Sequence, residues 1–209
     1  MHTIYAPARS EIEIKRSRFI ASLARTDSEQ AAREFIAQIR SEFPDARHHC
    51  TAFLIHQDTG PDTARSSDDG EPAGTAGGPM LNVLTESGLT NLTCVVTRYF
   101  GGTKLGTGGL VRAYSGAVQQ VLKDAQKARI ITQPSYQLHL PISEAGKIEA
   151  KLTQNGYQIL DRDFAEEASL RFAAPLETSQ SRIESYLSSI SGREITIERA
   201  ADITREVRE

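Results

Sequence analysis

The first clear pattern along the chain is an alternation of polar and apolar residues. Residues 11–15 read Glu-Ile-Glu-Ile-Lys, the period-two pattern of a half-buried strand, which is expected to resume through residues 19–20. Thr26 and Glu29 then stand at capping-box spacing, ahead of apolar residues at helical spacing up to Pro44. These patterns predict a strand followed by an amphipathic helix.

Two longer apolar runs continue the first half of the chain. Residues 50–56 predict a strand buried on both faces, and residues 92–100 predict a further strand. A short helix is expected over residues 80–88, ending at a glycine, and a longer helix over residues 110–126. Residues 57–79 are rich in Gly, Pro, Ser and Asp, and we expect them to be largely loop.

The second half has the pattern of a separate small domain. We expect residues 133–135, Gln-Pro-Ser, to be a linker. Strand, helix, strand, strand, helix and strand follow, with Ser143 capping the first helix and a polar end, residues 200–209, that frays. This β-α-β-β-α-β order is that of a ferredoxin-like domain. We therefore predict an N-terminal domain over residues 1–132 and a C-terminal domain over residues 133–209.

The composition is that of a globular protein rather than a disordered one, since 39% of the 209 residues are hydrophobic. No apolar stretch is long enough to cross a membrane, and the charged first residues show no secretory signal. We therefore expect a cytoplasmic protein with no membrane partner. The two cysteines, Cys50 and Cys94, lie in apolar runs and are expected to be buried thiols rather than a disulfide.

The charge balance excludes a broadly basic nucleic-acid coat, because the net charge is −3. Residues 1–132 hold 15 Lys and Arg against 14 Asp and Glu, whereas residues 133–209 hold 9 against 13. Nucleic-acid binding would therefore need a local cluster of cations, and the first domain is the better place for one.

Three segments of the first domain can carry chemistry, and the first is Arg47-His48-His49-Cys50. Because neighbours on a strand point to opposite faces, His48 and His49 cannot both hold one metal ion. No zinc-ligand spacing lies nearby. The pattern favours structural or hydrogen-bonding histidines, with a metal or catalytic role as the alternative.

The second segment is an acidic loop, Asp68-Asp69-Gly70-Glu71, which continues in a Gly- and Pro-rich run to Pro79. Three carboxylates can hold Mg²⁺ or act in acid–base chemistry. Asp and Gly are also ordinary turn formers, and Asp69 can cap the helix that follows. Both interpretations stay open.

The third segment is a glycine-rich loop between a predicted strand and a predicted helix. Such a loop offers backbone N–H groups and a helix dipole to an anion, although neither the Walker nor the G-x-G-x-x-G spacing is present. Tight turns and close packing are the structural alternative. The candidate anion- or nucleic-acid-binding residues are Arg98, Tyr99, Gly101, Gly102, Lys104, Gly106, Gly108, Gly109 and Arg112.

Signatures of common catalytic sites are missing from the sequence. Neither G-x-S-x-G nor H-E-x-x-H occurs. Cys50 beside His49 is a poor catalytic pair, because neighbours on a strand diverge. We therefore predict no catalytic residue, no metal and no cofactor.

These segments together resemble the YigZ/IMPACT family. The matching segments are residues 15–20, 47–50, 67–75 and 77–106. The first of them resembles the opening segment of the family, with Arg16 where lysine is common. The motif match spans residues 15–115 and is long and specific, whereas the second half matches the bacterial members by pattern alone.

The resemblance implies an α+β fold in both halves. The first domain is expected to be similar to domain 2 of the fifth small-subunit ribosomal protein and to domain IV of elongation factor G. That fold contains a left-handed βαβ crossover, against the usual right-handed rule. The second domain is expected to resemble domain V of elongation factor G, in agreement with its ferredoxin-like order. Two domains similar to those of a ribosome-binding factor suggest an RNA or ribosome partner by analogy.

The resemblance also implies a function. Eukaryotic IMPACT relatives regulate translation initiation during amino-acid starvation, through protein binding and with a different second domain. We expect a non-catalytic cytosolic factor that binds RNA or the ribosome and takes part in regulating translation. The alternatives are a protein-interaction regulator and a phosphate- or nucleotide-dependent enzyme. The enzyme would hold phosphate in the glycine-rich loop and a metal on Asp68, Asp69 and Glu71.

Overall fold

The computed structural model describes residues 1–208, which form two compact units. Unit 1 comprises Met1–Ile130 and the end of the chain from Glu206, and unit 2 comprises Ile131–Arg205. Each unit has a hydrophobic core of its own.

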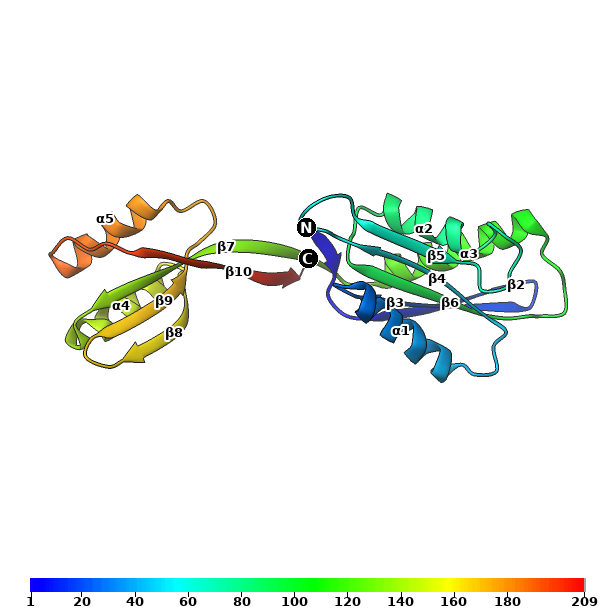
Figure 1. Ribbon diagram of the computed structural model, residues 1–209, viewed down its shortest axis with the longest axis horizontal. Helices are drawn as coiled ribbons and strands as arrows, with labels where there is room; N and C mark the ends of the chain where they lie inside the picture. Colours follow the sequence, from blue (N-terminus) through cyan, green and yellow to red (C-terminus); the bar gives the residue numbers. More distant parts are fainter. Residues whose placement is uncertain (209) are drawn as a thin grey trace. The chain divides into compact units, whose positions relative to one another are not determined.

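Unit 1 is built on a five-stranded antiparallel sheet in the order β2-β3-β6-β4-β5 (Figure 1). Its strands are β2 (Ala8–Ile14), β3 (Ser17–Arg25), β4 (His48–Ile55), β5 (Thr63–Ser67) and β6 (Leu92–Tyr99). The register of the central strand β6 places Arg98 opposite Phe19 on β3 and opposite His48 on β4. A short strand, β1 (His2–Ile4), pairs instead with the first residues of β7 (Lys127–Leu140).

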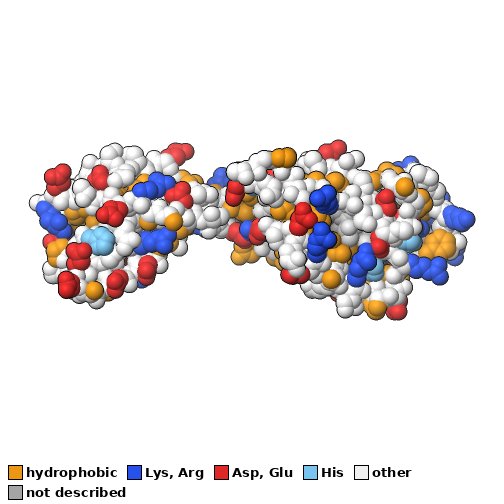
Figure 2. Space-filling view, viewed as in Figure 1, with side chains coloured by type: hydrophobic (Ala, Val, Ile, Leu, Met, Phe, Trp, Pro, Cys, Tyr) orange, Lys and Arg blue, Asp and Glu red, His pale blue; other side chains and the backbone are white. Residues whose placement is uncertain are grey.

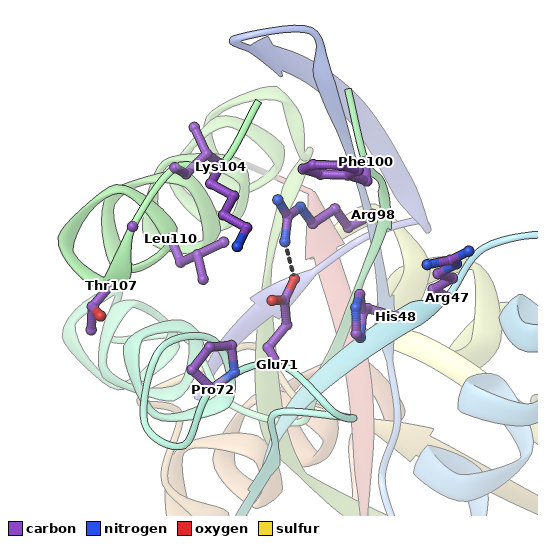
Figure 3. Close-up of a pocket in the computed structure, with 11 residues that line it drawn as sticks. Arg47, His48, Glu71, Pro72, Arg98, Phe100, Lys104, Thr107 and Leu110 are labelled. Carbon is purple, nitrogen blue, oxygen red and sulfur yellow. Dashed lines mark hydrogen bonds and ion pairs between the residues drawn. The ribbon is translucent and has the colours of Figure 1, made fainter. Parts of the chain in front are cut away.

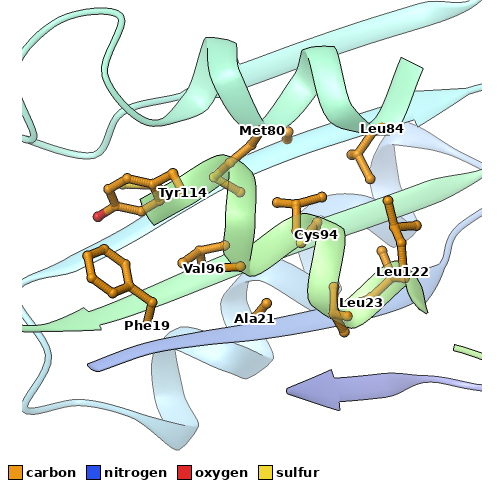
Figure 4. Packing of buried hydrophobic residues seen from close by; sticks show 14 of the residues in the cluster. Phe19, Ala21, Leu23, Met80, Leu84, Cys94, Val96, Tyr114 and Leu122 are labelled. Atoms are coloured by element: carbon orange, nitrogen blue, oxygen red, sulfur yellow. The ribbon is translucent and has the colours of Figure 1, made fainter. Parts of the chain in front are cut away.

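Helices cover both faces of this sheet. Helices α2 (Gly77–Glu86) and α3 (Thr107–Asp124) pack on the face that carries Phe19, Ala21 and Val96, and together they enclose the main core (Figure 4). Helix α1 (Glu29–Glu42) packs against the other face through Ala32 and Phe53. Because side chains alternate along a strand, β4 contributes to both layers.

Unit 2 confirms the predicted β-α-β-β-α-β order. The elements that follow β7 are α4 (Ile142–Gln154), β8 (Gln158–Phe164), β9 (Ala168–Ala173), α5 (Gln180–Ser191) and β10 (Glu198–Arg208). Strand β7 lies between β9 and β10, and β8 pairs with β9 on its other side. Tyr136, Leu138 and Phe172 of the sheet pack with Ile148 of α4 and Leu187 of α5 in one core.

Three elements differ from the sequence predictions. The segment 57–79 is not largely loop, because strand β5 lies within it. Residues 133–135 are not a linker but part of the continuous strand β7, where the Pro134 carbonyl accepts a hydrogen bond from Ala174 N. Residues 200–208, which were expected to fray, are part of strand β10, which pairs with β7, and Glu209 lies outside the described residues.

Two helix caps also differ from the predictions. Ser28, not Thr26, caps α1 by accepting a hydrogen bond from Ala31 N, while the Thr26 hydroxyl pairs with that of Thr93 at 2.6 Å. Helix α4 begins after Pro141 without a side-chain cap, so the expected Ser143 cap is wrong. No helix within residues 1–208 combines the length and apolar character needed to span a membrane.

Candidate functional site

A pocket of about 440 Å³ lies in unit 1 where β6 ends and α3 begins (Figure 3). Its walls come from the start of β4, the acidic loop after β5, the end of β6 and the glycine-rich loop before α3. The polar and charged lining residues are Arg47, His48, Glu71, Arg98, Lys104 and Thr107, and the apolar ones include Pro72, Phe100, Leu105 and Leu110. The three segments singled out in the sequence therefore meet at this pocket.

Arg98 is the buried cation of the pocket. Its side chain is 8% exposed, and its Nη1 donates a hydrogen bond to Glu71 Oε1 at 2.5 Å. The guanidinium lies 5.4 Å from the ring centroid of Phe19 and 5.7 Å from that of Phe100, so aromatic rings also stabilise it. Arg98 Nε has no hydrogen-bond partner within residues 1–208. A buried donor left without a partner is unfavourable.

Glu71 acts as a structural carboxylate. Its side chain is 4% exposed, and Oε1 accepts a second hydrogen bond from the Tyr114 hydroxyl at 2.7 Å. Burial, the largest cause, raises the pKa of Tyr114, so this hydroxyl keeps its proton and acts as a donor. The negative charge of Glu71 is therefore held against Arg98 rather than presented to an incoming anion.

His48 belongs to the pocket, and its ring orientation is fixed by the acidic loop. Its Nδ1 lies 2.9 Å from the Asp69 carbonyl oxygen, which can only accept, so Nδ1 carries a proton. Nε2 is the nitrogen left free of that bond. Gly70 turns the loop beneath the ring with φ +85°, a left-handed conformation that favours glycine.

Asp68 does not face the pocket but holds the backbone that leads into α2. Its Oδ1 accepts hydrogen bonds from Ala76 N at 2.9 Å and Gly77 N at 2.8 Å, and its Oδ2 accepts one from Gly74 N at 2.8 Å. Burial alone would raise the pKa of Asp68, but these three amides together lower it. Asp68 is therefore an ionised capping group.

Asp69 and His49 belong to the opposite side of β4. Asp69 accepts hydrogen bonds from His49 N at 2.7 Å and from Arg40 Nη2 at 2.6 Å. His49 Nδ1 lies 3.1 Å from Thr97 Oγ1, and burial lowers the pKa of this histidine. The prediction that His48 and His49 diverge is confirmed. The three carboxylates of the acidic loop do not converge, and residues 1–208 contain no cluster of His, Cys, Asp and Glu suited to a metal ion.

The glycine-rich loop brings the start of α3 to the pocket. Gly106 is the N-cap residue with φ +73°, and the helix has neither a side-chain cap nor an acidic residue in its first turn. The first N–H groups of a helix have no partner within it, and they carry partial positive charge. Gly101 has a different role, because a Cβ there would lie 2.0 Å from the backbone carbon of Arg16.

The two exposed cations of the pocket, Arg47 and Lys104, make no hydrogen bond or ion pair with any residue of 1–208. Arg112 is exposed on α3 beside Gly108 but does not line the pocket, and Tyr99 stacks on Arg18 instead. Of the residues predicted to bind an anion or nucleic acid, Arg98, Lys104 and Gly106 line the pocket. Those outside the lining are Tyr99, Gly101, Gly102, Gly108, Gly109 and Arg112.

The arrangement is suited to holding an anion. Cys50 lies close by and donates to the Asp68 carbonyl, but burial raises its pKa to about 12, so it is not a thiolate nucleophile. Phe19 and Tyr114, which contact Arg98 and Glu71, were not predicted as site residues, because both read as ordinary core residues. Arg47 could have been predicted as a site residue, because it stands next to His48 in the sequence.

Comparison with known proteins places this pocket inside a shared domain. Residues 15–122 match the model of the Impact N-terminal domain. The IMPACT family member YigZ of Escherichia coli strain K12 is 45% identical over 170 residues, covering 81% of this chain and 83% of that protein. The IMPACT family member YvyE of Bacillus subtilis strain 168 is 38% identical over 164 residues, covering 78% and 75%.

A solved structure extends the likeness to both units. The crystal structure of a hypothetical protein has a TM-score of 0.62 and 39% identity to this chain. The aligned region covers 96% of this chain and 97% of that one.

Proposed function

Because the chain belongs to the IMPACT family, we propose that it is a non-catalytic factor in the control of translation that binds RNA or the ribosome through the pocket at the start of α3. Family membership supports the regulatory part, since the resemblance to IMPACT proteins implies a role in translation. The chemistry of the pocket supports the RNA-binding part.

The observation that carries this proposal is a pair of exposed, unpaired cations in a pocket that also contains an uncapped helix start. Lys104 lies near the first turn of α3, and Arg47 lines the opposite side of the pocket beside His48 (Figure 3). The one carboxylate of the lining, Glu71, is already neutralised by Arg98. Phosphate groups bind well at such helix starts. On the face shown in Figure 2, Lys and Arg side chains gather around hydrophobic and His surface at the right-hand end of unit 1.

The test is co-sedimentation with ribosomes over a salt series, comparing the wild type with an Arg47→Ala, Lys104→Ala double variant. Both side chains are exposed and unpaired, so the variant should fold normally. We expect the wild type to pellet at low salt. The logarithm of the binding constant falls linearly with the logarithm of the salt concentration. Losing two phosphate contacts should make this slope less steep by about 1.5.

A matched control removes the same charge elsewhere in unit 1. Lys123 and Arg129 are exposed, and neither lines the pocket. The Lys123→Ala, Arg129→Ala variant should sediment like the wild type. Wild-type protein that stays in the supernatant at every salt concentration would overturn the proposal. Binding to ribosomes but not to purified ribosomal RNA would assign the contact to a ribosomal protein.

A further inference from the structure

We propose that the pocket receives the terminal phosphate of a nucleotide, either a free nucleoside monophosphate or the phosphorylated end of an RNA strand. For the RNA end, this inference rests on the proposed function and names the group that the same site recognises. A terminal phosphate has three free oxygens, whereas an internal phosphodiester has two and is continued by the chain on both sides. The two groups therefore need different sites.

The charge of the lining matches a terminal phosphate better than an internal one. Arg47, Arg98 and Lys104 supply three positive charges, and Glu71 supplies one negative charge, which leaves a surplus of two. A phosphomonoester carries about −1.5 to −2 at pH 7. A phosphodiester carries a single negative charge and would leave part of this surplus unmatched.

The donors in the pocket point to a ligand with several acceptor oxygens. Arg98 lines the pocket and is more than nine-tenths buried, and within residues 1–208 only its Nη1 makes a hydrogen bond. Figure 3 shows its guanidinium reaching from β6 toward Lys104 and Leu110. At the start of α3, the first backbone N–H that bonds within the helix is that of Leu110, which donates to Gly106 O at 2.9 Å. The N–H groups before it are free of intrahelical bonds.

The apolar part of the lining suits an organic group next to the phosphate. Pro72, Leu105 and Leu110 line the pocket beside the cations. The Phe100 ring lies over the Arg98 guanidinium and is 56% exposed, so an aromatic base has room to stack on it. Bases stack on exposed aromatic rings with little dependence on sequence. A site for inorganic phosphate alone would have no use for this surface.

The test is isothermal titration of the full chain with a set of matched ligands. The small ligands are inorganic phosphate, a nucleoside and its 5′-monophosphate. The RNA ligands are three forms of one eight-nucleotide sequence: one with hydroxyl groups at both ends, one with a 5′-phosphate and one with a 3′-phosphate. We expect one of the two phosphorylated RNAs to bind at least tenfold more tightly than the RNA with hydroxyl ends. Lys104→Ala should abolish this preference, whereas Lys123→Ala should leave it unchanged. Phe100→Ala should weaken monophosphate binding about tenfold and leave inorganic phosphate unaffected.

The outcomes separate this inference from the proposed function. RNAs that bind equally well with and without a terminal phosphate would overturn the inference for the RNA end and leave RNA binding in place. A nucleoside monophosphate that binds in a Lys104-dependent way, without any RNA or ribosome binding, would uphold the inference and remove the proposed function. If no phosphorylated ligand binds, the inference is wrong. Thermal unfolding of each variant checks that these exposed substitutions leave the fold intact.

Discussion

At the scale of single residues, Asp68 makes the stability of the acidic loop depend on pH. Three backbone amides, those of Gly74, Ala76 and Gly77, lower its pKa in the folded state more than burial raises it. Its contribution is therefore present above the ordinary aspartate pKa of about 4 and is lost as the pH falls through the folded-state pKa. Asp68→Asn should lower the free energy of unfolding by about 1–2 kcal/mol at pH 7. Urea unfolding at pH 7 and pH 3 measures this, and the difference should shrink at the lower pH.

An exposed aspartate supplies the comparison for Asp68. Asp58 is exposed and has no partner among residues 1–208, so Asp58→Asn should leave the free energy of unfolding unchanged at both pH values. If Asp68→Asn behaved like Asp58→Asn at pH 7, the capping role of Asp68 would be wrong.

Gly101 is the glycine of the loop that the fold requires for packing. A Cβ there would lie 2.0 Å from the Arg16 carbonyl carbon, which is backbone and cannot move aside without shifting β3. Gly101→Ala should destabilise unit 1 by about 1–3 kcal/mol or more. Gly78→Ala is the matched change, because nothing lies within 4 Å of its added Cβ. Equal melting temperatures for the two variants would contradict the packing argument.

Residue types on a strand predicted the direction of side chains but not their long-range partners. The divergence of His48 and His49 followed from period-two geometry alone. That His48 would share the pocket with Glu71 depends on pairing β4 with β6 and on the path of the acidic loop. Such pairings join residues far apart in the sequence, and no local pattern encodes them.

At the scale of elements, Glu71 fastens the acidic loop to both β6 and α3. It accepts hydrogen bonds from Arg98 of β6 and Tyr114 of α3, and all three side chains are buried. Glu71→Ala leaves the Arg98 charge buried without its partner, which should lower the free energy of unfolding by about 3–5 kcal/mol. Glu71→Gln and Arg98→Met each break the same ion pair. The loss in free energy of unfolding in the double variant should therefore be smaller than the sum of the losses in the two single variants. Urea unfolding of this double-mutant cycle measures the coupling.

A surface ion pair is the control for that experiment, because it carries the same charges without burial. Arg9 and Glu42 form a bidentate ion pair at the surface, where their side chains are 42% and 41% exposed. Solvent screens such a pair, so Glu42→Gln should have little effect on unfolding. Additive changes in the Glu71 and Arg98 cycle would show that the two residues act independently, contrary to the structure.

Apolar periodicity predicted the elements that build the cores but missed the polar strands β5 and β10. Strand β5 reads Thr-Ala-Arg-Ser-Ser and is mostly exposed, so it offers no alternation to detect. Strand β10 is similarly polar over most of its length. Pro134 marked a linker by composition, but a proline whose carbonyl still accepts a hydrogen bond can lie within a strand. These polar strands are held by backbone pairing, which does not depend on an apolar pattern and which every residue type except proline can supply in full.

At the scale of the whole molecule, the two units have separate cores and different charges. The core of unit 1 joins β3, β4 and β6 to α2 and α3, and the core of unit 2 joins β7 and β9 to α4 and α5. The cations of the pocket all lie in unit 1, in the near-neutral first half of the chain, whereas the second half is acidic. We therefore infer that unit 1 carries the proposed binding activity by itself.

Truncation after Ile130 tests this inference. The shortened chain keeps the unit 1 core, every residue of the pocket, and the pairing of His2–Ile4 with Lys127–Arg129. It loses the part of unit 1 that begins at Glu206, which forms an ion pair with Arg25. It should unfold cooperatively in urea and bind a nucleoside monophosphate as tightly as the full chain does. A chain ending at Asp124 keeps the pocket but loses the partner of β1, so it should unfold at a lower urea concentration. If the chain ending at Ile130 fails to unfold cooperatively, unit 1 depends on the rest of the chain. If it folds but does not bind, residues beyond Ile130 contribute to the site.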